Sequence, residues 1–179
     1  MDWIYQLSTR YRTSQWLKAK KLEVAHLPWK GWAASKRVGI LFDAHSNRTD
    51  LEPLREVVAH WKAKQRSVTL CGWTGQMRPK NVLYNGRQLI FTDDFTWRGA
   101  PESGNALEFM QTEFDVLIVL HRTSGTPLDA LAAKTPAGMR ICAAGDQDFY
   151  DLCMLPEGSH YIPYTELLSA WLTKIAPTL

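Results

Sequence analysis

Apolar runs alternate with amphipathic segments along the chain from Arg37 onward. Residues 38–42 are continuously apolar and end at Asp43, a pattern typical of a strand covered on both faces. Similar runs predict further strands at residues 67–73, 87–92, 114–120 and 139–144. Apolar residues at helical spacing predict helices at residues 51–61, 105–112, 127–134 and 164–175, with a short helical turn at 149–155 and a short extended piece at 161–162.

Strands that alternate with helices favour a parallel sheet with helices on both faces, joined by right-handed crossovers. We therefore expect an α/β fold, a three-layer Rossmann-like sandwich with a mostly parallel sheet of about five strands and an N-terminal helical extension. Residues 2–21 carry apolar side chains near one helical face, and residues 26–34 contain Pro28 and Gly31, which indicate a linker. This pattern predicts two parts: a helix and linker at 1–36, and a Rossmann-like domain at 37–179.

The charge is divided unevenly between these two parts. Residues 1–37 contain eight basic and two acidic residues and four of the eight tryptophans, whereas the rest of the chain has a net charge of −3. A basic, Trp-rich helix can pack its aromatic stripe on the body or on a second subunit, forming a homo-oligomer. It can also contact an anionic membrane or nucleic acid. The charge of the body indicates no polyanionic partner, so contact with nucleic acid or membrane is expected only through residues 1–37.

The cysteines and the hydropathy favour a cytoplasmic protein. No segment approaches the ~18–20 consecutive apolar residues that a membrane span needs, and no apolar stretch of a secretory signal follows Arg10 and Arg12. The three cysteines show neither a C-x-x-C motif nor zinc spacing. Two of them, Cys71 and Cys142, lie in apolar runs, where a free cysteine behaves as a small hydrophobe. We expect a reducing compartment and predict no metal site.

Ligands of parallel α/β sheets bind beyond the carboxyl ends of the strands. The candidate site residues on the loops after the first, third and fourth strands are Asp43, His45, Asn47, Arg48, Trp97, His121, Arg122 and Ser124. If the first and fourth strands are neighbours, their loops face one crevice. No G-x-G-x-x-G or Walker A motif is present, so the sequence identifies no cofactor.

Two interpretations of these loops remain open. In the first, His45 or His121 is a general base oriented by Asp43, and Arg48 or Arg122 binds an anion. In the second, the same residues end strands, cap helices and are solvated. Trp97 can likewise be a stacking platform over the crevice or part of a lid that packs on the edge of the sheet.

Several strings resemble a family of uncharacterised proteins from Bacteroidota, defined only as a domain of unknown function. These strings are Phe114–Ile118, Leu128 with Leu131, Met139–Cys142 and Asp94–Gly99. Members are similar in length and open with a basic helix followed by an apolar first strand. The resemblance covers nearly the whole chain and implies no assigned activity.

Residues 114–118 and 139–142 are also similar to the N-terminal half of heptosyltransferase-like glycosyltransferases, in which a Phe/Tyr-Asp-apolar strand precedes a helix and an Arg-containing strand start. The loop at 43–48 lacks the Gly-rich, acidic turn of those enzymes, and we expect no second, nucleotide-sugar-binding domain in 179 residues. This similarity therefore supports the fold more than any catalysis.

Three functional hypotheses follow from the sequence. The first is a non-catalytic cytoplasmic protein that acts by binding or assembly. The second is a small-ligand or nucleotide-sugar-related, enzyme-like domain with its site at the carboxyl ends of the strands. The third is contact with an anionic surface through the basic N-terminal helix.

Overall fold

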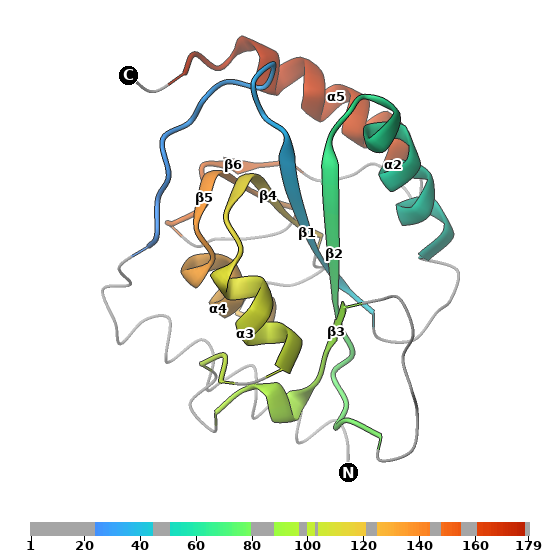
Figure 1. The fold of residues 1–179 in the computed structure, drawn as a ribbon, viewed down its shortest axis with the longest axis vertical. Coiled ribbons are helices and arrows are strands. Elements are labelled where there is room, and N and C mark those ends of the chain that lie inside the picture. The colour runs from blue at the N-terminus through green and yellow to red at the C-terminus, as the bar shows by residue number, and fades with distance from the viewer. Residues whose placement is uncertain are drawn as a thin grey trace.

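The computed structural model describes residues 24–44, 51–79, 88–96, 100–102, 104–120, 125–143, 148–154 and 161–177. Strands and helices alternate along these residues (Figure 1). The elements are β1 (Arg37–Asp43), α2 (Leu51–Ala63), β2 (Ser67–Trp73), β3 (Gln88–Ile90), the 3₁₀ helix η2 (Thr92–Asp94), α3 (Gly104–Gln111), β4 (Phe114–Leu120), α4 (Pro127–Lys134), β5 (Ala137–Cys142), β6 (Leu152–Cys153) and α5 (Tyr161–Lys174). The predicted helix at residues 2–21 lies outside the described residues.

The strands of the described residues form one sheet in the order β3-β2-β1-β4-β5-β6, and every neighbouring pair is parallel. The chain builds outward from β1 to β3, then returns to the other side of β1 and builds outward again from β4 to β6. The Rossmann-like α/β fold expected from the sequence is therefore confirmed, with six parallel strands in place of about five.

Two short predictions near the C-terminus were wrong. The predicted helical turn at 149–155 is extended instead, because Leu152 and Cys153 pair with Ile141 and Cys142 at the open edge of β5. The predicted extended piece at 161–162 is the first turn of α5, which begins at Tyr161. The first difference arises at the edge of the sheet, where pairing with β5 decides the conformation.

Helices cover both faces of the sheet, with α2 and α5 on one face and α3 and α4 on the other (Figure 1). Successive residues of a strand point to opposite faces, so a strand in the middle layer is apolar at most positions. In β1, Val38 and Ile40 join the core beneath α2 and α5, whereas Leu41 joins the core beneath α3 and α4. The apolar runs at 38–42 in β1 and 116–120 in β4 follow from this double coverage.

The described part of the predicted linker packs on the body of the molecule. Trp29 and Trp32 are 3% and 7% exposed and belong to the same core as α2 and α5. The Leu27 amide donates to the carbonyl of Ala137 over 3.0 Å, and the Ala137 amide donates to the carbonyl of Ala25 over 3.2 Å. Residues 25–27 therefore lie along the first residue of β5, while the boundary at residue 37 stays a prediction.

Candidate functional site at the carboxyl ends of β1 and β4

The direction in which the chain adds strands to the sheet reverses between β1 and β4. These two strands are parallel neighbours, and Phe42 lies opposite Leu120 in the register. Their carboxyl ends therefore lie side by side, toward the lower side of Figure 1. The expectation that the first and fourth strands are neighbours is confirmed. In parallel sheets this switch point is where a crevice for a ligand forms.

Of the eight candidate site residues, Asp43 is the one within the described part of the chain. It is half-buried at the end of β1, and the next amide, that of Ala44, donates to the carbonyl of Trp73 over 2.7 Å. The remaining candidates lie outside the described residues: His45, Asn47, Arg48, Trp97, His121, Arg122 and Ser124. Residues 45–48 follow Ala44 after the end of β1, and residues 121–124 follow Leu120 at the end of β4. Both candidate loops therefore start from neighbouring strands.

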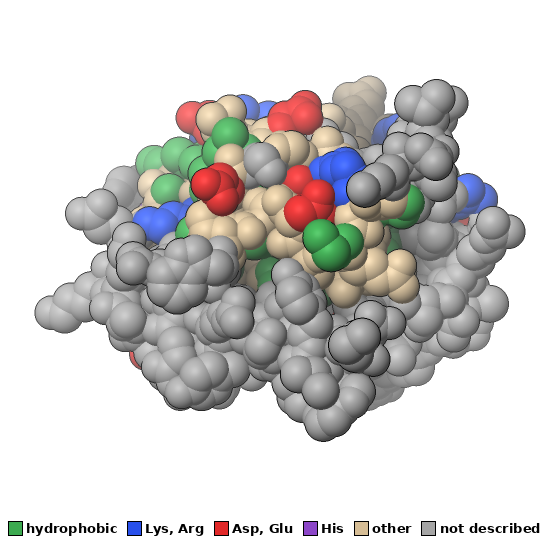
Figure 2. Space-filling view, turned by 90° about the horizontal axis from the view of Figure 1, so that it is seen from below, with side chains coloured by type: hydrophobic (Ala, Val, Ile, Leu, Met, Phe, Trp, Pro, Cys, Tyr) green, Lys and Arg blue, Asp and Glu red, His purple; other side chains and the backbone are tan. Residues whose placement is uncertain are grey.

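The described surface at this end of the sheet carries charges of both signs side by side (Figure 2). On the β3 side, Arg78 donates to Asp94 over 2.6 Å, and its backbone amide donates to Asp93 over 2.9 Å. Asp94 is 2% exposed and also accepts the Phe91 amide over 2.9 Å. Asp93 and Asp94 therefore join the segment after β2 to η2.

The residues before the Trp97 loop pack on the end of β2. Phe95 is 8% exposed, and its ring meets that of Trp73 edge-on, with the ring centroids 5.4 Å apart. Edge-to-face pairs of this kind stabilise the contact beyond the area they bury. Phe95 thus serves as a packing residue of this loop, whereas the role of Trp97 stays a prediction.

On the other side of the switch point, α4 begins with a capping box. Asp129 is fully buried and accepts the backbone amide of Thr126 over 2.8 Å and the hydroxyl of Tyr150 over 2.6 Å. Burial raises the pKa of Tyr150, and the adjacent Asp129 carboxylate raises it further. Tyr150 therefore remains a neutral donor, and its bond to Asp129 connects the chain before β6 to the first turn of α4.

The structure pairs two cysteines that sequence analysis expected to be free. Cys142 and Cys153 form a disulfide, whereas Cys71 is a free, buried thiol. The parallel pairing of β5 with β6 places Cys142 opposite Cys153, with their Cα atoms 4.8 Å apart. Sequence reasoning missed this pair because the separation of 11 residues matches no redox motif. The two cysteines come together only through the pairing of β6 with β5, which no local pattern in the sequence reveals.

The described residues hold no group of three or more His, Cys, Asp or Glu side chains placed to bind a metal ion. Among the same residues, no helix has the length and apolar character needed to cross a bilayer.

A parallel sheet in this strand order, with helices on both faces, defines a Rossmann-like α/β protein. The chain belongs to a family of unknown function (DUF6913), whose model matches residues 10–175. Comparisons with curated proteins and with solved structures return no match.

Proposed function

We propose that this protein is a non-catalytic binding protein that holds a small, negatively charged ligand at the switch point. The parallel pairing of β1 with β4 is the observation that supports it, because it starts both candidate loops from adjacent strand ends. Those loops contain Arg48, Arg122, His45 and His121, which are donors suited to phosphate or carboxylate groups. A nucleotide is the ligand class that best matches this fold and these side chains.

Two buried carboxylates near this end of the sheet are committed to structural contacts and not to catalysis. Asp94 is held by Arg78 and by the Phe91 amide, while Asp129 is held by Thr126 and Tyr150. These described groups are engaged in joining loops and capping α4. A general base needs access to the substrate, and buried carboxylates committed to such contacts do not provide it.

A thermal-shift screen of nucleotides and nucleotide sugars tests the proposal. We expect at least one compound to raise the unfolding midpoint of the full chain, because a ligand that binds only the native state stabilises it. His45→Ala and Arg122→Ala should abolish this shift without lowering the midpoint of the unliganded protein.

Arg37→Ala is the matched control, because Arg37 lies at the opposite, amino end of β1 and forms an exposed pair with Glu113. This variant should keep the full ligand-induced shift. A shift retained in both His45→Ala and Arg122→Ala, or lost equally in Arg37→Ala, would contradict a site at the switch point.

The similarity of residues 114–118 and 139–142 to heptosyltransferase-like enzymes suggests a nucleotide sugar as a second candidate ligand. We propose this enzyme-like alternative within the same screen. It predicts that nucleotide sugars raise the midpoint more than the matching nucleoside diphosphates, since the sugar adds contacts of its own. Equal shifts for the two compounds would favour simple nucleotide binding.

We also propose that the protein comes from Bacteroidota and is cytoplasmic. Residues 1–37 are proposed to act in assembly or in contact with an anionic surface. The tryptophans of this segment support contact with a second subunit, and its excess of basic residues supports contact with an anionic surface. Deleting residues 1–21 leaves Ala25, Leu27 and their bonds to Ala137 in place, so the deletion tests the segment by itself. Loss of dimers in sedimentation would support assembly, and loss of retention on anionic vesicles or RNA at low salt would support surface contact.

A further inference from the structure

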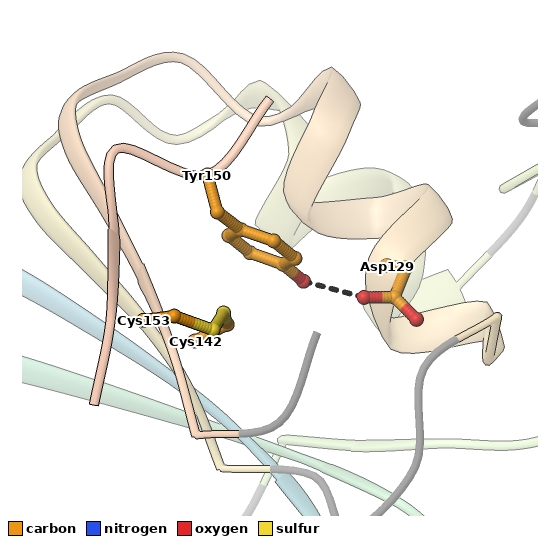
Figure 3. The surroundings of a disulfide bond; sticks show 4 residues. All are labelled: Asp129, Cys142, Tyr150 and Cys153. Carbon is orange, nitrogen blue, oxygen red and sulfur yellow. Dashed lines mark hydrogen bonds between the residues drawn. A yellow bond between two sulfur atoms is a disulfide. The ribbon is translucent and has the colours of Figure 1, made fainter. Parts of the chain in front are cut away.

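The disulfide at the edge of the sheet joins two sulfur atoms in very different surroundings. Figure 3 shows the bond between the two cysteines. Cys142 is fully buried at the end of β5, whereas Cys153 is exposed on β6. Of the two residues, Cys153 is the one in contact with solvent, so a thiol from solution approaches the bond from the side of Cys153. This asymmetry selects the sulfur atom at which thiol–disulfide exchange begins, because exchange requires access to the attacked sulfur.

Few backbone contacts hold β6 beside β5. The strand is two residues long and forms the last position in the described sheet. The Asp151 amide donates to the carbonyl of Arg140 over 2.9 Å, and the Met154 amide donates to the carbonyl of Cys142 over 2.9 Å. The Asp151 carboxylate in turn accepts the amide of Arg140 over 2.7 Å. Elements with so few contacts open locally at low free-energy cost, so the disulfide is an important restraint on β6.

The chain just before β6 has an anchor that does not depend on the disulfide. Tyr150 donates to the buried carboxylate of Asp129 on α4 over 2.6 Å, and its ring packs against that of Phe149 at 4.5 Å between centroids. Figure 3 shows Tyr150 and Asp129 beside the disulfide. Opening the bond would therefore release residues 152–154 while the preceding residues stay attached to α4.

We propose that the Cys142–Cys153 disulfide is a thiol-exchange site, modified at Cys153 by low-molecular-weight thiols such as glutathione. The thiolate of the small molecule attacks Sγ of Cys153 and forms a mixed disulfide with it. The bond to Cys142 breaks, and Sγ of Cys142 leaves with the electron pair and takes a proton from solvent. A second small thiolate then attacks the small-molecule sulfur of the mixed disulfide. This step releases the oxidised small-molecule disulfide and leaves a thiol at Cys153.

The leaving sulfur in this exchange belongs to Cys142, which is fully buried at the end of β5. In a reducing compartment, a disulfide of this kind is transient rather than structural.

Alkylation and mass mapping of the oxidised full chain test the exchange. With reduced glutathione in limiting amount under native conditions, the mixed disulfide should map to Cys153. With excess glutathione, two thiols per chain should become alkylated. Cys71 is the internal control, because burial raises the pKa of this thiol and keeps it from reacting. Release of the two thiols only after denaturant is added, or an adduct on Cys142, would overturn the proposal.

Single variants give an independent measurement. With oxidised glutathione, Cys142→Ser should form an adduct at the exposed Cys153, whereas Cys153→Ser should leave the buried Cys142 unmodified. Equal modification of the two variants would overturn the assignment of Cys153 as the attacked residue.

Hydrogen exchange measures the consequence for β6. Reduction should raise exchange at the Asp151 and Met154 amides by at least tenfold and leave the amides of β1 and β4 unchanged, and Cys142→Ser/Cys153→Ser should match the reduced protein. Unchanged exchange after complete reduction would show that the disulfide does not restrain β6. The proposal does not depend on the ligand site at the switch point.

Discussion

Asp115 shows how a single buried carboxylate holds the chain before β1. It is 7% exposed and accepts the backbone amides of Lys36 and Arg37 over 2.7 and 2.8 Å, with Lys30 Nζ at 3.4 Å. Burial, the largest single influence, raises the pKa of Asp115, but the two amides and the charge of Lys30 outweigh it and lower this pKa below its usual value. The folded protein therefore favours the charged form.

The lowered pKa of Asp115 predicts a loss of stability in acid. Because the folded pKa lies below the unfolded value of about 3.9, this carboxylate stabilises the fold above that pH, and its contribution is lost as the pH falls through the folded pKa. We expect Asp115→Asn to lower the free energy of unfolding by about 1–3 kcal/mol at pH 7, since the neutral amide receives the two N–H donors less well.

Urea unfolding of both proteins at pH 7 and near pH 2 provides the measurement. The difference between them should shrink in acid, and a difference that stays constant or grows would contradict this account. Glu113→Gln serves as the control, since its exposed pair with Arg37 contributes at most about 1 kcal/mol.

Arg140 is the residue that connects β5, α4 and the segment before β1. It is fully buried, and its guanidinium donates to the carbonyls of Ala132, Thr135 and Ala25 over 3.0, 2.8 and 2.8 Å. Burial lowers the pKa of Arg140, but a guanidinium stays protonated at any pH at which proteins fold. Three backbone carbonyls and the nearby Asp151 carboxylate therefore stabilise the positive charge.

Replacing Arg140 by Lys should destabilise the protein, because an ammonium group cannot span these three acceptors. The expected loss is about 3 kcal/mol or more, since a buried charge and buried carbonyls are left with incomplete hydrogen bonding. Arg37→Lys, on the exposed end of β1, should change the unfolding midpoint little. Equal midpoints for Arg140→Lys and the unmodified protein would refute the role of the guanidinium as a connector.

At the scale of elements, Gly138 allows the segment before β1 to approach β5. A Cβ atom at this position would lie 2.9 Å from the carbonyl oxygen of Asp115 and 3.2 Å from that of Pro28. Both atoms belong to the backbone, so neither can move as a side chain would. Gly138→Ala should cost about 1–3 kcal/mol through overpacking. It should also raise hydrogen exchange at the Leu27 amide, and unchanged exchange there would contradict this close approach.

The elements predicted best are those whose sequence signals lie in consecutive or closely spaced residues. The bounds of β2, β4 and α4 match the prediction, because Ser67–Trp73 and Phe114–Leu120 are continuous strand-like runs and Thr126 with Asp129 supplies a local cap. By contrast, β6 exists only through its pairing with β5, which no local pattern reveals. For the same reason, the disulfide could not be predicted from cysteine spacing.

The sequence predicted which loops lie beside each other at the candidate site, but not the contacts of the residues around them. The rule that ligands bind beyond strand ends selected the loops after β1 and β4, and their adjacency is confirmed by the pairing of Phe42 with Leu120. The engagement of Asp94 with Arg78 and of Asp129 with Tyr150 could not be predicted, because each bond joins segments 16 or 21 residues apart.

At the scale of the whole molecule, two truncations separate the N-terminal residues from the body. Deleting 1–21 keeps Trp29, Trp32 and the contacts of residues 25–27 with Ala137, so the protein should stay folded. Deleting 1–36 removes both buried tryptophans, and the loss of one such side chain costs about 3–5 kcal/mol. Circular dichroism should therefore show a cooperative transition for the first variant and none for the second. A cooperative transition in both would mean that residues 37–179 fold alone.

The central claim is that the neighbouring carboxyl ends of β1 and β4 form the ligand site. A two-dimensional ¹H–¹⁵N titration of the full chain with the nucleotide that gives the largest thermal shift tests it most directly. The account predicts that the amides of Asp43, Ala44, Leu120 and Gly125 move first and saturate together. Movement confined to the opposite ends of the same strands, at Arg37 and Phe114, or to α5, would contradict it.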